Sequence, residues 1–220
     1  MNVLAFDCST QACSAAVLAG DKVLAHRFAP MARGQAEAMM PMIVEVLAEA
    51  GLSWAEIALV GVTVGPGTFT GLRIGLAAAR GMALAGNLPV AGVTTCEAVA
   101  HATSPEERQG RSLLVAIDGK RADLFIQPFA ADLTPLAAPA ALMPEEAAGL
   151  VAGPLLLAGD GAGRLAEALP GAVLLSAASG FPDARVVARL AARRWAEGTA
   201  LPPVPLYLRP PDVTLPGAAP

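Results

Sequence analysis

The sequence predicts an α/β protein built from two similar halves. Short apolar runs, typical of buried strands, alternate with longer segments of helical periodicity. A strand–turn–strand pattern at residues 3–18 recurs at residues 113–127. Of the 220 residues, 55% are apolar and 15% are charged. That composition supplies enough apolar material for sizeable cores and excludes an intrinsically disordered chain.

The first half is expected to contain both strands and helices. The segment 35–50 carries an apolar stripe through Met39 and Val46 at helical spacing, and Gly51 follows as a stop. Thr94 and Glu97 have the spacing of a capping box, which opens a helix. The predicted strands cover residues 3–6, 15–18, 22–25, 59–64 and 89–93, and the predicted helices cover residues 35–50, about 68–86 and a segment from 94 onward.

The pattern restarts after a polar segment at residues 104–110. Residues 130–154 give no clear element, and the proline-rich end of the chain is expected to be extended rather than packed. The predicted strands cover residues 113–117, 123–127, 155–158 and 173–175, and a helix covers 183–197. We therefore expect a first lobe at residues 1–106, a second at 107–201 whose last helix is free to pack back on the first, and a tail at 202–220.

Composition and spacing exclude several classes of function. The net charge of −4 gives no overall basic signature for wrapping nucleic acid. The longest apolar stretches are interrupted by Gly65–Gly67 and by Pro89, so no membrane span is expected. The two histidines lack the spacing of a catalytic metal site, and no G-x-S-x-G elbow is present. We expect no catalytic residue, metal or cofactor. Three cysteines without a C-x-x-C pair, and a start without signal-peptide features, favour the cytoplasm.

Each half carries an aspartate where an apolar strand ends. Asp7 and Asp118 occupy equivalent positions, although strand–Asp–turn–strand is common enough in α/β proteins to recur by chance. A duplicated pair of this kind is the layout of the actin-like architecture, in which two such hairpins face the phosphates of ATP. The first hairpin of that site usually reads Asp-x-Gly-x-Thr, but here Ser9 replaces the glycine and would crowd a phosphate. Lys120 and Arg121 occupy the second turn. ATP hydrolysis is therefore disfavoured, and an ATPase or small-molecule kinase using Asp7 and Asp118 with Mg-ATP is kept as the alternative.

The segment from Gly65 to Leu76 is the most distinctive in the chain. It matches neither a Walker A loop nor G-x-G-x-x-G. Its glycines could shape a strand-to-helix turn capped by Thr68 or Thr70, or the turn could hold an anion through free N–H groups. The residues expected at any anion or nucleotide contact are Asp7, Ser9, Thr10, Gly67, Thr68 and Asp118.

The helix after this turn has more apolar surface than one sheet can cover. Its only charges are Arg73 and Arg80, and apolar residues form two stripes where an ordinary surface helix has one. The helix is either enclosed within its own domain or shared between the sheet and a partner. Methionines concentrated at residues 31–42 favour the second interpretation, because methionine suits adaptable contact surfaces. The residues expected to bind a partner are Met39, Met42, Ile43, Val46, Gly71, Ile74, Gly75, Ala78 and Met82.

Several motifs together resemble the bacterial TsaB (YeaZ) family. The most specific is Gly65-Pro-Gly-Thr-Phe-Thr-Gly-Leu-Arg-Ile-Gly75, supported by Asp7-Cys-Ser-Thr10, Pro41-Met-Ile43 and the closing Tyr207-Leu-Arg209. The resemblance covers the first half well and the second half loosely, through Asp118 and Gly159-Asp-Gly161. It implies a two-lobed actin-like (ASKHA) fold with duplicated mixed sheets flanked by helices.

The resemblance also implies a role in making threonylcarbamoyladenosine at adenosine 37 of tRNAs that read ANN codons. In that family the chain is not the catalyst but pairs, through its first two helices, with the TsaD subunit that performs the transfer. A TsaE ATPase joins the pair, and tRNA binds only to the complex. The sequence leaves open whether the isolated chain forms homodimers through the same helices. The older glycopeptidase label has no peptidase site to support it.

Two departures from the family pattern stand out. Family members usually carry His-Ser-Glu at the start of the first helix, where this chain has Gln35-Ala-Glu37. The usual second hairpin, Asp-Ala-Arg-Arg-Gly-Glu-Val-Tyr, becomes Asp118-Gly-Lys-Arg-Ala-Asp-Leu-Phe125. The first departure removes that histidine but leaves the apolar helix intact. The second indicates that the second lobe has drifted.

Overall fold

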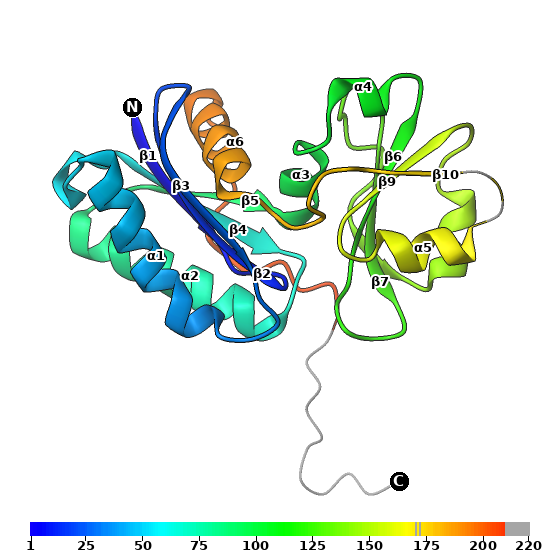
Figure 1. The fold of residues 1–220 in the computed structure, drawn as a ribbon, viewed down its shortest axis with the longest axis horizontal. Helices are drawn as coiled ribbons and strands as arrows, with labels where there is room; N and C mark the ends of the chain where they lie inside the picture. The colour runs from blue at the N-terminus through cyan, green and yellow to red at the C-terminus, as the bar shows by residue number, and fades with distance from the viewer. Residues whose placement is uncertain (170, 172, 210–220) are drawn as a thin grey trace, which may run out of the picture.

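A computed structural model describes residues 1–169, 171 and 173–209. The described residues form two five-stranded mixed sheets flanked by helices, as predicted (Figure 1). The first sheet has the order β3-β2-β1-β4-β5, and the second has the order β10-β9-β6-β7-β8. The strands are β1 (Asn2–Asp7), β2 (Ala12–Ala19), β3 (Lys22–Pro30), β4 (Leu59–Gly65), β5 (Val90–Thr94), β6 (Ser112–Ile117), β7 (Leu124–Phe129), β8 (Ala140–Leu142), β9 (Leu155–Ala158) and β10 (Val173–Leu175).

The two sheets share one topology. In the first sheet β1 pairs antiparallel with β2 and parallel with β4, and in the second β6 pairs antiparallel with β7 and parallel with β9. The outer strands continue both patterns. β1 and β6 are therefore equivalent central strands, so Asp7 at the end of β1 and Asp118 directly after β6 occupy matching positions. The predicted duplication is confirmed.

Helices cover both faces of the first sheet. Alternate residues of a strand point to opposite faces, so Leu4 and Phe6 pack under α1 (Gln35–Ala50) and α2 (Phe69–Gly86). Val3 and Ala5 pack on the other side against α6 (Ala184–Glu197). Figure 1 shows α1 and α2 side by side on one face and α6 beyond the other. The last helix of the described residues thus lies on the first sheet.

The second sheet is covered by shorter elements. α3 (Thr95–Ala100) lies on one face, and α5 (Ala162–Ala168) with the 3-10 helix η2 (Pro144–Gly149) on the other. The predicted capping box is confirmed, since the Thr94 hydroxyl accepts a hydrogen bond from the Glu97 N–H at 3.1 Å. β8, η2 and α5 are not anticipated from the sequence, because segments of three to seven residues are too short for an apolar repeat to stand out. The remaining short elements are η1 (Trp54–Glu56) and α4 (Pro105–Arg108), the latter within the expected polar boundary.

α2 is the longest helix of the described part, with 18 residues. It begins after Thr68, whose hydroxyl accepts a hydrogen bond from the Gly71 N–H at 3.2 Å, and ends at Asn87, which has a left-handed φ of 49°. Within the described residues, neither α2 nor any other helix has the length and apolar character needed to cross a membrane.

The expectation of an unpacked tail is wrong for residues 202–209. The Leu206 N–H donates to the Val64 carbonyl at 2.7 Å, and Arg209 Nε lies 2.6 Å from an Asp123 carboxylate oxygen. This segment therefore joins the first sheet to the second hairpin. A proline-rich composition predicts an extended main chain but does not reveal its long-range partners. Residues 210–220 of the expected tail lie outside the described residues.

Candidate functional site

Asp7 is fully buried and engaged by its own chain. One carboxylate oxygen accepts hydrogen bonds from the Ser9 N–H at 3.1 Å, the Ser9 hydroxyl at 2.6 Å and the Thr63 hydroxyl. The other oxygen has no hydrogen-bond partner within the described part of the chain. Burial raises the pKa of Asp7 to about 6, against the opposing effect of the bonds from Ser9 and Thr63. The protonation of this carboxylate is therefore set by burial and by hydrogen bonds from its own chain rather than by solvent.

Ser9 folds back into this network. Its hydroxyl donates to Asp7 and accepts from the Thr95 hydroxyl at 3.2 Å. Thr10 is 2% exposed, and its hydroxyl has no partner among the residues that the structure describes. A serine at the position of the usual glycine thus caps the aspartate from within the turn.

The glycine segment holds the first hairpin against the start of α2. A Cβ atom on Gly67 would lie 2.3 Å from the Ser9 carbonyl oxygen, and one on Gly71 would lie 2.0 Å from the Cys8 carbonyl oxygen. The Thr68 N–H, a candidate anion donor, already donates to the Ser9 carbonyl at 2.8 Å. These contacts favour the structural interpretation of the segment, with Thr68 as the helix cap.

Two cations contact the aspartate of the second hairpin, Lys120 from the hairpin itself and Arg164 from α5. Asp118 carboxylate oxygens lie 3.1 Å from Lys120 Nζ and 3.1 Å from Arg164 Nη1. Burial alone would raise the pKa of Asp118, but hydrogen bonds from Lys120 and the charges of Lys120 and Arg164 lower it below its ordinary value. Lys120 Nζ also donates to Gln11 Oε1 at 2.7 Å, which links the two hairpins. The described residues contain no group of three or more His, Cys, Asp or Glu side chains that could hold a metal ion.

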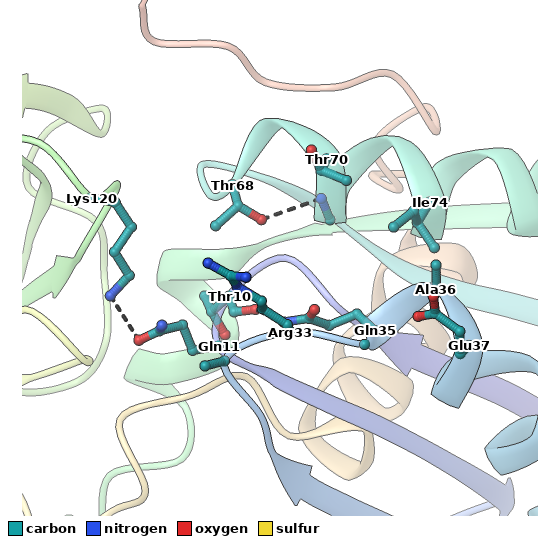
Figure 2. A pocket seen from close by; sticks show the side chains of 13 residues that line it. Thr10, Gln11, Arg33, Gln35, Ala36, Glu37, Thr68, Thr70, Ile74 and Lys120 are labelled. Carbon is teal, nitrogen blue, oxygen red and sulfur yellow. Dashed lines mark hydrogen bonds between the residues drawn. The ribbon is translucent and has the colours of Figure 1, made fainter.

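A pocket of about 390 Å³ opens between the first hairpin and the starts of α1 and α2. Figure 2 shows Arg33 and Thr10 between Lys120 on one side and Gln35 and Glu37 on the other. Of the predicted anion contacts, Thr10 and Thr68 line this pocket, whereas Asp7, Ser9, Gly67 and Asp118 are not among its lining residues. The lining carries two cations, Arg33 and Lys120, one carboxylate, Glu37, and several hydroxyl and amide groups, so the pocket suits a small polar ligand.

Gln35 secures the start of α1 beside that pocket. Its amide nitrogen donates to the Thr10 carbonyl at 3.2 Å and to the Met31 carbonyl at 3.1 Å. Gln35, which stands where the resemblance expects a histidine, therefore ties α1 to the first hairpin.

The structure divides the residues expected to bind a partner into two groups. Buried in the chain's own core are Met39, Ile43, Val46, Gly71 and Gly75. Half-buried at the edge of that core are Met42, Ile74, Ala78 and Met82. The first group faces the sheet and has no surface to offer a partner.

The most exposed apolar residues of these helices lie within the segments expected to hold a partner, 39–47 and 71–85, but were not among the individual residues named for that contact. Met40 is 43% exposed, Val44 is 61% exposed and Leu84 is 87% exposed. Met40 and Val44 are four residues apart, so they form a second stripe beside the buried one, and that spacing could have revealed it. We call the outer surface formed by Ala36, Met40, Val44, Ile74, Ala77, Ala78, Gly81 and Leu84 the α1/α2 face.

One flank of α2 is covered by the chain's own C-terminal segment. Arg80 donates to the Pro203 carbonyl at 2.9 Å, and Arg73 Nε donates to the Tyr207 hydroxyl at 3.2 Å. The Arg73 guanidinium also lies 3.6 Å from the centre of the Phe69 ring. Both arginines of α2 are therefore satisfied along the segment 202–209.

Comparison with known proteins identifies the family. The model of tRNA N6-adenosine threonylcarbamoyltransferase (TsaD) matches residues 23–166. The Escherichia coli tRNA threonylcarbamoyladenosine biosynthesis protein TsaB is 35% identical over 125 residues, which cover 57% of this chain and 53% of that protein. The match thus spans about half the length of this curated relative. An uncharacterized Mycobacterium tuberculosis protein is 34% identical over 96% of this chain and 92% of its own length.

Among solved structures, YeaZ from Pseudomonas aeruginosa is 28% identical and superposes with a TM-score of 0.82. The superposition covers 94% of this chain and 99% of that one. The predicted two-lobed actin-like fold with duplicated sheets is thereby confirmed. The chain belongs to the family matched by the threonylcarbamoyltransferase model and, within it, to the TsaB (YeaZ) proteins.

Proposed function

We propose that this chain is a non-catalytic subunit of a tRNA threonylcarbamoyl transferase and that its α1/α2 face binds a TsaD-like catalytic subunit. The observation that carries the proposal is the exposed apolar surface of two adjacent helices, with Val44 61% and Leu84 87% exposed. Leaving such a surface in water is unfavourable, and rows of apolar residues on neighbouring helices are typical of protein interfaces. In this role the chain positions the partner for transfer to adenosine 37 of tRNAs that read ANN codons.

The buried residues of the sequence prediction keep a role in this proposal. Met39, Ile43 and Val46 pack α1 on the sheet, and Leu72, Leu76 and Ala79 do the same for α2. Both helices are thus held rigid before any partner arrives, so less conformational entropy is lost on binding. A TsaE-like ATPase joins the assembled pair, tRNA binds to the complex, and the assembly acts in the cytoplasm.

The alternative is an ATPase or small-molecule kinase that uses Asp7 and Asp118. Three features count against it. Asp7 is fully buried, Ser9 occupies the turn where a phosphate would approach, and Asp118 is already paired with two cations. Asp7 is closed off from solvent, and Asp118 would have to release its two cations before either could accept a hydrated magnesium ion.

Reconstitution separates the two functions. The chain alone is expected to show no ATP turnover and no transfer to tRNA. A TsaD-like and a TsaE-like protein from the same cell are expected to need this chain for full transfer activity. Asp7→Asn is expected to leave that reconstituted activity within about twofold of wild type, because Asp7 touches no reacting group in this account. Micromolar Mg-ATP binding by the isolated chain, coupled to turnover and lost in Asp7→Asn, would favour the alternative.

Asp7 also makes a prediction about stability and pH. A carboxyl whose pKa is higher in the folded state than in the unfolded chain binds its proton more tightly when folded. Its contribution to stability is therefore present at low pH and is lost as the pH rises from about 4 to about 6. Relative to wild type, Asp7→Asn is expected to gain about 2 kcal/mol in free energy of unfolding between pH 4.5 and pH 7.5. Urea titrations at the two values measure this difference, and a pH-independent difference would show that Asp7 is not desolvated.

A further inference from the structure

A second cavity lies on the side of the first sheet opposite the α1/α2 face. Its volume is about 560 Å³, and it is bounded by α6, the β2–β3 turn and the residue that ends α3. Its lining residues are Met1, Gly20, Asp21, His101, Val186, Arg189, Leu190, Ala192 and Arg193. It plays no part in the function proposed above.

Two arginines of this cavity have no partner within the described part of the chain, unlike their neighbours on the same helix. Arg185 is paired with Asp183, and Arg194 with Glu97. Arg189 and Arg193 are exposed, and no described residue forms a hydrogen bond or ion pair with either. They are four residues apart, so their guanidinium groups lie one helical turn apart on one face of α6.

His101 adds a third nitrogen donor to the same cavity. The charges of Arg193 and Arg194 of α6 and Arg108 of α4 act on its ring, with Glu97 of α3 as the opposing charge. Burial lowers the pKa of His101, and the three arginines lower it further, against the effect of Glu97. An anion in the cavity would offset this repulsion, because it interacts favourably with both the arginines and a protonated imidazole.

We propose that the cavity between α6 and the β2–β3 turn binds a phosphate ester group, carried by a free nucleotide or by a polynucleotide. Two guanidinium forks and an imidazole match the several oxygen atoms of a phosphate better than the two of a carboxylate. Val186, Leu190 and Ala192 supply an apolar wall against which a nucleobase packs. Asp21 is the acidic residue of the lining and opposes anion binding through its charge.

Proton NMR of the full chain tests this site, because the sequence has only two histidines. The probes are sulfate as a phosphate mimic of constant charge, AMP, and a six-nucleotide single-stranded RNA. Each is expected to shift the His101 ring resonance and to leave that of His26 in place. By linkage, an anion that favours the protonated imidazole must bind more tightly at pH 5.5 than at pH 8. Binding of AMP or RNA more than tenfold tighter than sulfate identifies which source carries the phosphate.

Two variants are expected to change the anion affinity in opposite directions, which a simple loss of folding could not do. Arg193→Ala is expected to weaken binding about tenfold, whereas Arg185→Ala, which removes the same charge from the same helix outside the cavity, is expected to change it less than twofold. Asp21→Asn is expected to strengthen binding about two- to threefold. Absence of any shift at His101 with all three probes, or equal affinity in Arg193→Ala and wild type, overturns the proposal.

Discussion

A chain carrying Val44→Asp and Leu84→Asp is expected to lose its partner while keeping its fold. Both side chains are largely exposed, at 61% and 87%, so the free energy of unfolding should change by no more than about 1 kcal/mol. In the complex each aspartate would be buried without a counter-charge, which costs several kcal/mol. The affinity for a TsaD-like subunit is expected to fall at least about 100-fold, as measured by sedimentation of the mixed proteins.

A matched variant keeps this result interpretable. Leu136 and Leu175 are about half exposed, at 51% and 52%, and lie in the second half of the chain, away from α1 and α2. Leu136→Asp with Leu175→Asp adds the same two charges and is expected to leave the affinity unchanged. Equal loss of binding in both double variants would mean that net charge, rather than the α1/α2 face, governs assembly.

Gly71→Ala is expected to destabilise the folded chain strongly. The added Cβ atom would lie 2.0 Å from the Cys8 carbonyl oxygen, so either the first hairpin or the start of α2 must move. Overpacking of this kind costs about 3 kcal/mol or more when the obstructing atom belongs to the backbone. Thermal and urea unfolding measure the loss.

Gly81→Ala is the control within the same helix. Apart from the local backbone of the helix and the two neighbouring residues, no heavy atom lies within 4 Å of its added Cβ, so the change should raise stability by up to about 1 kcal/mol through helix propensity alone. If Gly71→Ala proved as harmless as Gly81→Ala, the glycine segment would not be needed for packing, and an anion-binding role for it would regain support.

The sequence predicts most of the fold because its main elements are strongly periodic. The helix over residues 35–50 agrees with α1, and both its apolar stripe and Gly51 mark the observed face and end. The recurrence of an aspartate at the end of an apolar strand predicts the duplicated sheets. α5 escapes prediction because its seven residues include only one large apolar side chain, Leu165.

The partner surface is harder to predict because apolar spacing alone does not say which stripe faces the sheet. The predicted set included Met39, Ile43 and Val46, which are the most regular stripe and therefore the core. The exposed residues Met40 and Val44 have the same four-residue spacing as Met39 and Ile43 and are displaced from them by one residue along the helix. Only the position of the sheet separates the two stripes, and that position depends on contacts distant in sequence.

The sequence predicts the residues of the two aspartate hairpins but not their contacts. The sequence shows Ser9 in place of a glycine, but not that its hydroxyl turns inward onto Asp7. Nor does it show that Arg209 reaches Asp123, 86 residues away. Such contacts arise from tertiary structure and leave no local pattern.

Hydrogen exchange of the wild-type chain, with and without a TsaD-like subunit, tests the α1/α2 interface most directly. Slower exchange is expected at residues 36–48 and 73–85, with no change in α6 or the second sheet. A stable complex whose protection falls on α6 or the second sheet, with α1 and α2 exchanging as in the free chain, would contradict the account.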